Sequence, residues 1–416
     1  MTTDNPDSTG NPDTTGSPAG TQPPSGHEPA GRPPSRRLAM AAGATAAALV
    51  ILAVPAAALG LTGSLRAAPA VPSPVNSPMS GIKYAAGKAA PADQPAADPS
   101  ATASTAGTDY HGYVALAGGY SVAEVDVASD TIIADSISAD SPEGVAVTPD
   151  GSTVYLAETG QYQVIAVNAS TGAKTPIEVG PYPQDVAVSP NGSQVYATVT
   201  GGDTGAGGSD VVAVIDTSTN AVANDITVGS PPRQVVFSPD GTRAYVTTET
   251  GVSVINTTSG KVIAAIPDSL GPQGIAISPD GGTLYVTNPN ADDIWVIRAS
   301  TGQVTSRIAA GAEPYAIAVS PSGSRAYVTD MNSDSVSVIN TSDLRVTATV
   351  QVGRLPGSVA VTPDGSQVWV GNNLSGNISV INPATNAVTT TIQGGSGTAT
   401  LDAAPLAVAF TKATSP

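Results

Sequence analysis

A four-residue turn signal recurs six times between residues 148 and 365, and this repeat limits the possible folds more than any other feature. The six tetrads combine Ser or Thr, Pro, a small polar residue and Gly: Thr148–Gly151, Ser189–Gly192, Ser238–Gly241, Ser278–Gly281, Ser320–Gly323 and Thr362–Gly365. Their prolines are 41, 49, 40, 42 and 42 residues apart. Proline presets the backbone at one turn position, and glycine takes the conformation that other residues resist. Each tetrad therefore predicts a hairpin, repeated once per structural unit.

The residues around each turn predict four strands per unit. A short apolar strand precedes the turn, as in Gly274–Ile277, and an aromatic-led strand follows it, as in Tyr285–Asn288. A third strand alternates strictly, as in Val252–Ile255, and a fourth follows a polar turn. Four such strands make one blade of a β-propeller, and one blade buries too little surface to be stable alone. We expect an all-β fold with blades stacked around an axis.

Two markers count the blades, and both give seven. The aromatic residues of the second strand are Tyr113, Tyr155, Tyr196, Tyr245, Tyr285, Tyr327 and Trp369. The prolines that lead into the first strand are Pro142, Pro183, Pro232, Pro272, Pro314, Pro356 and Pro405. Tyr113 has no first strand before it, and the segment 405–410 has no second strand after it. The C-terminal strand is therefore predicted to close the ring as the innermost strand of the N-terminal blade, which removes open edges.

The strand-two sequences also carry a family resemblance. Tyr285–Asn288 reads YVTN, and Tyr245–Thr247 and Tyr327–Thr329 are near copies. The chain resembles the YVTN-family β-propeller repeat proteins over residues 109–416. This resemblance implies a seven-bladed propeller. Its YncE-like and surface-layer members imply contact with protein or glycan at the cell envelope, or a structural role in a surface layer.

Three segments precede the propeller. Residues 1–37 are rich in Thr, Pro, Gly and Ser and predict a disordered cytoplasmic tail. Residues 38–63 carry no charge and are long enough for a transmembrane helix or signal-anchor. Residues 64–108 predict an Ala- and Pro-rich stalk. Arg36 and Arg37 precede the apolar run, so the positive-inside rule predicts a single-pass membrane protein with its propeller outside. If the apolar segment is a cleaved signal peptide, the propeller is secreted.

Charge and composition restrict the function. Residues 109–416 contain 27 acids and 10 bases, so we expect no nucleic-acid partner, including the single-stranded DNA of YncE-like proteins. There is no cysteine, and the two histidines are His27 and His111, outside any predicted site. The sequence therefore predicts a binding or scaffold protein, not an enzyme, with no cofactor. The alternatives are a surface-layer structural protein and a lactonase-like hydrolase with a metal in the propeller funnel.

A candidate ligand site lies where the seven first strands begin. The residues after the lead-in prolines are predicted to ring the channel mouth: Glu143, Gln184, Arg233, Gln273, Tyr315, Gly357 and Leu406. The first five form a polar arc that we expect to bind a ligand. With one acid in the ring, no metal site is predicted there.

Loops between the second and third strands are expected to add polar residues to the same face. These residues are Glu158, Asn288, Asp292, Asp293, Asp330, Asp334, Asn372 and Asn373. Solvation is their expected role, with a Ca²⁺ site at Asp292 and Asp293 as the alternative. The glycine-rich insertion 200–210 lengthens one of these loops and predicts either a flexible flap or a recognition element.

Overall fold

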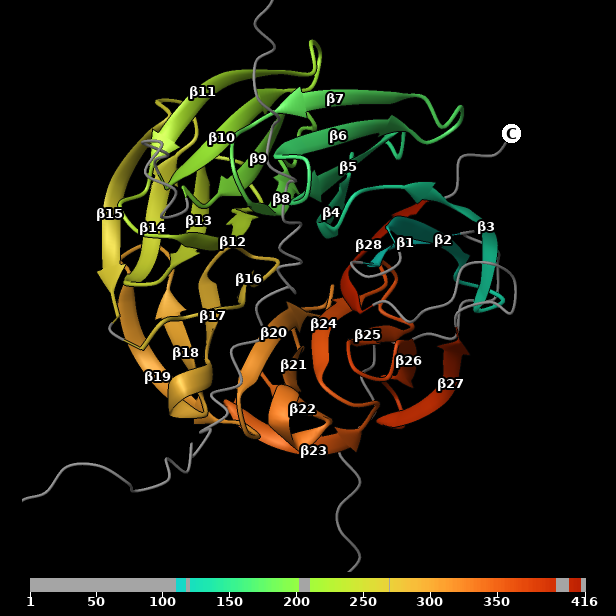
Figure 1. Cartoon of the computed structure of the whole chain (residues 1–416). Coiled ribbons are helices and arrows are strands. Elements are labelled where there is room, and N and C mark those ends of the chain that lie inside the picture. The colour runs from blue at the N-terminus through green and yellow to red at the C-terminus, as the bar shows by residue number, and fades with distance from the viewer. Residues whose placement is uncertain (1–109, 117–119, 202–209, 269, 394–403, 413–416) are drawn as a thin grey trace, which may run out of the picture. The chain divides into compact units, whose positions relative to one another are not determined.

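The computed structural model describes residues 110–116, 120–201, 210–268, 270–393 and 404–412. In this part of the chain the strands form seven antiparallel four-stranded sheets (Figure 1), which confirms the predicted all-β, seven-bladed propeller. Among the described residues, two loops contain short 3₁₀ helices, Pro289–Ala291 and Met331–Ser333. No helix among the described residues has the length and apolar character needed to cross a membrane. The segments 1–37, 38–63 and 64–108 lie outside the described residues.

Each blade runs from an innermost strand at the channel to an outermost one (Figure 1). Blade by blade, the strands are β28 (Pro405–Lys412), β1 (Tyr110–Leu116), β2 (Ser121–Asp126), β3 (Thr131–Ser138); β4 (Pro142–Val147), β5 (Thr153–Glu158), β6 (Gln163–Asn168), β7 (Lys174–Glu178); β8 (Pro183–Val188), β9 (Gln194–Val199), β10 (Val211–Asp216), β11 (Ala221–Thr227); β12 (Pro232–Phe237), β13 (Arg243–Thr248), β14 (Gly251–Asn256), β15 (Lys261–Pro267); β16 (Ile275–Ile277), β17 (Thr283–Asn288), β18 (Asp293–Arg298), β19 (Gln303–Ala309); β20 (Pro314–Val319), β21 (Arg325–Asp330), β22 (Ser335–Asn340), β23 (Arg345–Gln351); β24 (Pro356–Val361), β25 (Val368–Asn372), β26 (Asn377–Asn382) and β27 (Ala387–Gln393). The insertion lies largely outside the described residues, which omit 202–209.

The N-terminal and C-terminal strands of the propeller share one blade, as predicted from the missing first strand before Tyr113 and the missing second strand after residues 405–410. β28 pairs antiparallel with β1, with Val408 opposite Val114. Each innermost strand contacts the next around the ring, and β28 contacts both β24 and β4. The ring is therefore closed by the last strand of the chain.

The hydrophobic core lies between blades. Each of the seven buried clusters takes its side chains from two neighbouring blades, as where Tyr196 and Val212 pack against Val235 and Val246. The seven aromatic markers of the second strand are all buried. Each blade thus packs on both faces, so the stability of one blade depends on its neighbours.

The threonine of the YVTN-like motif links neighbouring blades at the channel wall. The Thr247 hydroxyl accepts a hydrogen bond from the Gln234 N–H at 3.0 Å and donates one to the Gln273 carbonyl of the next blade at 2.7 Å. Thr198 and Thr287 make the same bonds, and their acceptors in the next blade are the carbonyls of Arg233 and Tyr315. These hydroxyls therefore fix the backbone of three residues of the predicted channel-mouth arc.

Candidate functional site

The five residues of the polar arc begin the first-strand segments of five successive blades. Glu143, Gln184, Arg233, Gln273 and Tyr315 are each partly buried, and each follows a buried proline. The preceding proline restricts the backbone at the start of each strand, so the five side chains project from equivalent backbone positions in their blades. The structure therefore places the five at equivalent positions around the channel.

The charges of two other members of the arc affect the pKa of Tyr315. Burial raises the pKa of the Tyr315 phenol; the charge of Arg233 lowers it, and the charges of Glu143 and Glu313 raise it. Glu143, Arg233 and Tyr315 lie at the starts of β4, β12 and β20, on three blades of which no two are neighbours. The charges of Arg233 and Glu143 therefore affect Tyr315 from two other blades.

The Arg233 guanidinium has a hydrogen-bond donor that no described group of the protein uses. Its Nε atom is fully buried without a hydrogen-bond partner. The ion pairs among the described residues are His111–Glu124 and Arg307–Asp293, so no described carboxylate contacts the Arg233 guanidinium. A buried donor without a partner costs free energy, and a planar guanidinium matches carboxylate and phosphate oxygens. Arg233 is suited to bind an anionic group in the channel mouth.

Glu143 provides a group that can hold or release a proton. Burial raises the pKa of its carboxyl to about 7, against a smaller lowering by a hydrogen bond from Thr159. A carboxyl with this pKa exists in both protonation states near neutral pH. It can therefore donate a hydrogen bond to a ligand or accept a proton from one.

Asn373 joins the site, although its place in the sequence predicted solvation. At Gly357, the sixth ring position, a Cβ atom would collide with the Asn373 amide group. The Asn373 Oδ1 atom is buried and has no hydrogen-bond partner. The channel mouth thus offers an unpaired acceptor as well as an unpaired donor. Leu406, the seventh ring position, is partly buried.

Asp185 is a second residue that sequence reasoning missed. Its Oδ2 atom accepts a hydrogen bond from the Val235 N–H of the next blade at 3.0 Å. Burial raises the pKa of its carboxyl to about 7, while hydrogen bonds from the Val235 and Val186 backbones lower it. Asp185 joins β8 to β12 beside Arg233, and its role is to position these strands.

The expected solvation of the loop residues is wrong for four of them. Glu158, Asn288, Asp330 and Asn372 are buried, with exposed fractions of 2% or less. Glu158 Oε1 accepts a hydrogen bond from the Asp140 N–H at 2.8 Å, and Asp330 Oδ1 accepts one from the Gly311 N–H at 3.1 Å. These two carboxylates bind the backbone of the loop that leads into their own blade. These two polar loop residues therefore stabilise the fold by binding the protein backbone, and they are not exposed to solvent.

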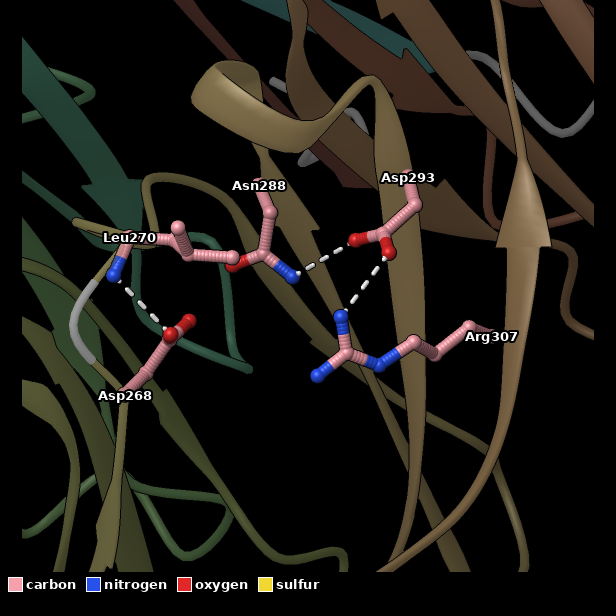
Figure 2. Close-up of polar contacts among 5 residues, drawn as sticks. All are labelled: Asp268, Leu270, Asn288, Asp293 and Arg307. Carbon is pink, nitrogen blue, oxygen red and sulfur yellow. Dashed lines mark hydrogen bonds and ion pairs between the residues drawn. The ribbon is translucent and has the colours of Figure 1, made fainter.

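The two aspartates considered for Ca²⁺ bind separate protein partners. Asp292 accepts a hydrogen bond from the Glu313 N–H at 2.8 Å. Asp293 contacts Asn288 at 3.0 Å and Arg307 at 3.2 Å, as Figure 2 shows. Within the described ranges, no three His, Cys, Asp or Glu side chains converge as metal ligands would. Each carboxylate is used to hold neighbouring backbone or side chains.

The comparisons with known proteins agree with this architecture. The family model described as "Lactonase, 7-bladed beta-propeller" matches residues 206–343, which include Arg233 and Tyr315 but not Glu143. No curated protein matches the chain. The match covers less than half of the chain, and together with the seven sheets it supports a seven-bladed β-propeller as the class of fold.

Two solved structures are similar in fold. Hydrazine synthase of Kuenenia stuttgartiensis has a TM-score of 0.58 and 24% identity, covering 64% of this chain and 90% of that chain. A protein from Desulfotomaculum acetoxidans, described as functionally unknown, has a TM-score of 0.58 and 15% identity, covering 70% of this chain and 96% of that one. At these identities the likeness shows the propeller fold alone.

Proposed function

We propose that this protein is a binding module of the YVTN kind at the cell envelope, whose channel mouth takes a carboxylate group of a protein or glycan partner. In this proposal residues 38–63 anchor the chain in the membrane and the propeller lies on the extracytoplasmic side. The observation that carries the proposal is the buried, unpartnered Nε of Arg233. The negative charge of the propeller favours a local arginine as the point of entry for an anionic group, because elsewhere acids outnumber bases.

Four side chains give the ligand its orientation. Arg233 pairs with the carboxylate, which is the strongest kind of hydrogen bond available in the mouth. Glu143 and Tyr315 lie at the same end of the innermost strands of two other blades and can donate to hydroxyl or carbonyl oxygens of the ligand. The unpaired Asn373 Oδ1 accepts from a hydroxyl or amide N–H. This set fits a polar ligand that combines one carboxylate with neighbouring hydroxyl or amide groups.

Isothermal titration calorimetry with the full-length protein tests the proposal. N-acetyl-alanine and glucuronate are compared with N-acetyl-alaninamide and glucose, which lack the carboxylate. We expect the acids to bind and Arg233→Gln to weaken them by at least tenfold. Arg354→Gln is the matched control, because Arg354 is exposed in a loop that leads into an innermost strand. Equal binding of acid and neutral analogue, or equal loss in both variants, would contradict the proposal.

A hydrolase is the second candidate, favoured by the lactonase family match and by the pKa of Glu143. The Glu143 carboxylate would take a proton from water, and the water oxygen would attack the lactone carbonyl. The ring C–O bond then breaks, the ring oxygen takes up a proton, and Arg233 binds the carboxylate of the hydroxy acid. Hydrolysis of a panel of γ- and δ-lactones that is lost in Glu143→Gln would support this candidate. No turnover of any lactone by the wild-type protein would reject it.

A further inference from the structure

Two tyrosines in the loops of the second blade, Tyr162 exposed and Tyr182 partly buried, form an aromatic pair. Tyr162 lies between β5 and β6, and Tyr182 lies between β7 and β8. Their ring centroids are 5.4 Å apart with an interplanar angle of 74°, an edge-to-face arrangement. Tyr162 is 47% exposed, although a large aromatic side chain gains most free energy when buried. Core packing does not explain this pair.

The backbone at both tyrosines is strained for such a side chain. Tyr162 has φ 61° and Tyr182 has φ 50°, in the left-handed region where residues with bulky side chains are uncommon. At the loop position equivalent to Tyr162, three other blades carry Asp292, Asp334 and Gly376, and the first blade carries Tyr120. Glycine and aspartate adopt this conformation at a lower cost. A tyrosine held there without burial suggests a functional use of its ring.

Two other blades have a hydrogen bond where this blade has the tyrosine pair. Asp292 and Asp334 accept hydrogen bonds from the N–H groups of Glu313 and Leu355, the residues before the next lead-in proline. Tyr182 is the residue equivalent to Glu313 and Leu355. In this blade an aromatic contact therefore takes the place of a hydrogen bond. Tyr182 also lies between Pro181 and Pro183, which limits its backbone freedom and preorganises the ring.

The surrounding charge is strongly negative. Residues 110–201 contain ten Asp and Glu but a single Lys or Arg, Lys174, whose Nζ donates to the Ser138 carbonyl at 2.6 Å. Asp140 accepts a hydrogen bond from Gln161, the residue before Tyr162. Glu178 is exposed and lies opposite Gln163, the residue after Tyr162. Asp140 and Glu178 thus contact, or lie opposite, the residues on either side of Tyr162.

We propose that Tyr162 and Tyr182, with Asp140 and Glu178, bind an arginine side chain of a partner protein. A guanidinium group stacks on tyrosine faces and pairs with carboxylates, so one ligand group satisfies both features of the patch. The net charge of this sector attracts a basic segment and repels an acidic one. This patch is separate from Arg233 and binds the opposite charge.

A pair of matched peptides tests the proposal on the full-length protein at low ionic strength, where surface charges are least screened. One is acetyl-Gly-Gly-Arg-Gly-Gly-amide, and the other has citrulline, a neutral isostere, in place of Arg. NMR titration should show saturable binding of the Arg peptide and at least tenfold weaker binding of the citrulline peptide. Tyr162→Ala and Tyr182→Ala should each raise Kd at least fivefold, whereas Tyr162→Phe keeps the ring and should stay within twofold.

The control is Tyr120→Ala. Tyr120 occupies the equivalent loop position of the first blade, is 62% exposed and has φ 51°, but the residue equivalent to Tyr182 there is Ser141. This variant should bind as the wild type does. Arg233→Gln should also bind the peptide normally, which separates this result from the channel-mouth proposal. Absence of binding, equal affinity for both peptides, or an equal loss in Tyr120→Ala would overturn the inference.

Discussion

At the scale of the residue, the hydroxyl of Thr247 lies fully buried between two innermost strands, where it accepts from one blade and donates to the next. Not every blade has this threonine. In the seventh blade, glycine replaces the threonine in the equivalent segment Trp369-Val370-Gly371. A Cβ atom at Gly371 would collide with the Ser358 hydroxyl. Ser358 instead donates to the Pro405 carbonyl of β28 at 3.1 Å. The link between blades is therefore preserved although its hydroxyl comes from the other strand.

Replacement of Thr247 by valine should destabilise the ring. Valine keeps the shape but leaves the Gln234 N–H and the Gln273 carbonyl without this partner, so we expect a loss of about 2–4 kcal/mol in the free energy of unfolding. Urea denaturation measures the change. Thr389→Val is the control: Thr389 is exposed and donates only to the Val380 carbonyl of its own blade, so its effect should be within about 0.5 kcal/mol. Equal losses would contradict the linking role.

Asp185 predicts a dependence on pH. Burial raises the pKa of its carboxyl from 3.8 to about 7, so folding favours the protonated form. Its contribution to stability is therefore greatest below pH 4 and falls as pH rises to about 7. The substitution Asp185→Asn introduces an amide that is neutral at every pH and retains an acceptor for the Val235 N–H. We expect this variant to be more stable than the wild type by about 1–2 kcal/mol at pH 8, allowing for the partial solvent access of the site, and equal near pH 4. Urea titrations at both pH values that show a less stable variant at pH 8 would refute this.

At the scale of the element, β28 joins the end of the chain to its first blade. Phe410 lies edge-to-face on Trp369 of the preceding blade, with ring centroids 5.2 Å apart. Gly112 of β1 lies beneath these rings, where a Cβ atom would be 2.9 Å from the Trp369 side chain. The closing strand therefore contributes to two sets of contacts, its ladder with β1 and its packing against the seventh blade.

Removal of residues 404–416 should accordingly open the ring. The loss of the β28 ladder and the Phe410 contact leaves β1 with an unpaired edge, so we expect a fall in melting temperature of roughly 10 °C or more, or aggregation. A chain lacking only residues 413–416, which follow β28, is the control and should melt as the intact protein does. Thermal denaturation followed by circular dichroism gives the result. A truncated chain that melts normally would show that β28 does not close the ring.

Strands and ring closure could be predicted from the sequence because turn signals and lead-in prolines are local and recur. The positions of Glu143, Arg233 and Tyr315 followed from the same register. Asp185 could not be found in this way, because its hydrogen-bond partner lies on another blade. Asn373 was placed on this face, but the burial of its unpaired Oδ1 was not predicted. Glu158 and Asp330 were assigned to solvent because polar loop residues usually are exposed. Their burial depends on how each loop folds back over its own blade, which no local pattern records.

At the scale of the whole molecule, the seven interfaces bring side chains from distant parts of the sequence to one channel. Glu143 and Tyr315 are 172 positions apart in the sequence, yet one affects the pKa of the other. The ring also carries two regions of opposite charge. One is Arg233 at the channel, whose Nε has no hydrogen-bond partner among the described residues, and the other is the acidic sector of the first blades, where Tyr120 and Tyr162 are exposed. The two proposed sites therefore select ligands of opposite sign.

The most direct test of the account is a crystal structure of the protein with whichever carboxylate ligand binds more tightly. The account predicts a carboxylate oxygen within about 2.7–3.0 Å of the Arg233 guanidinium, with Glu143 and Tyr315 contacting the same molecule. A ligand bound elsewhere, or an Arg233 side chain paired with Glu143 in the presence of saturating ligand, would contradict it.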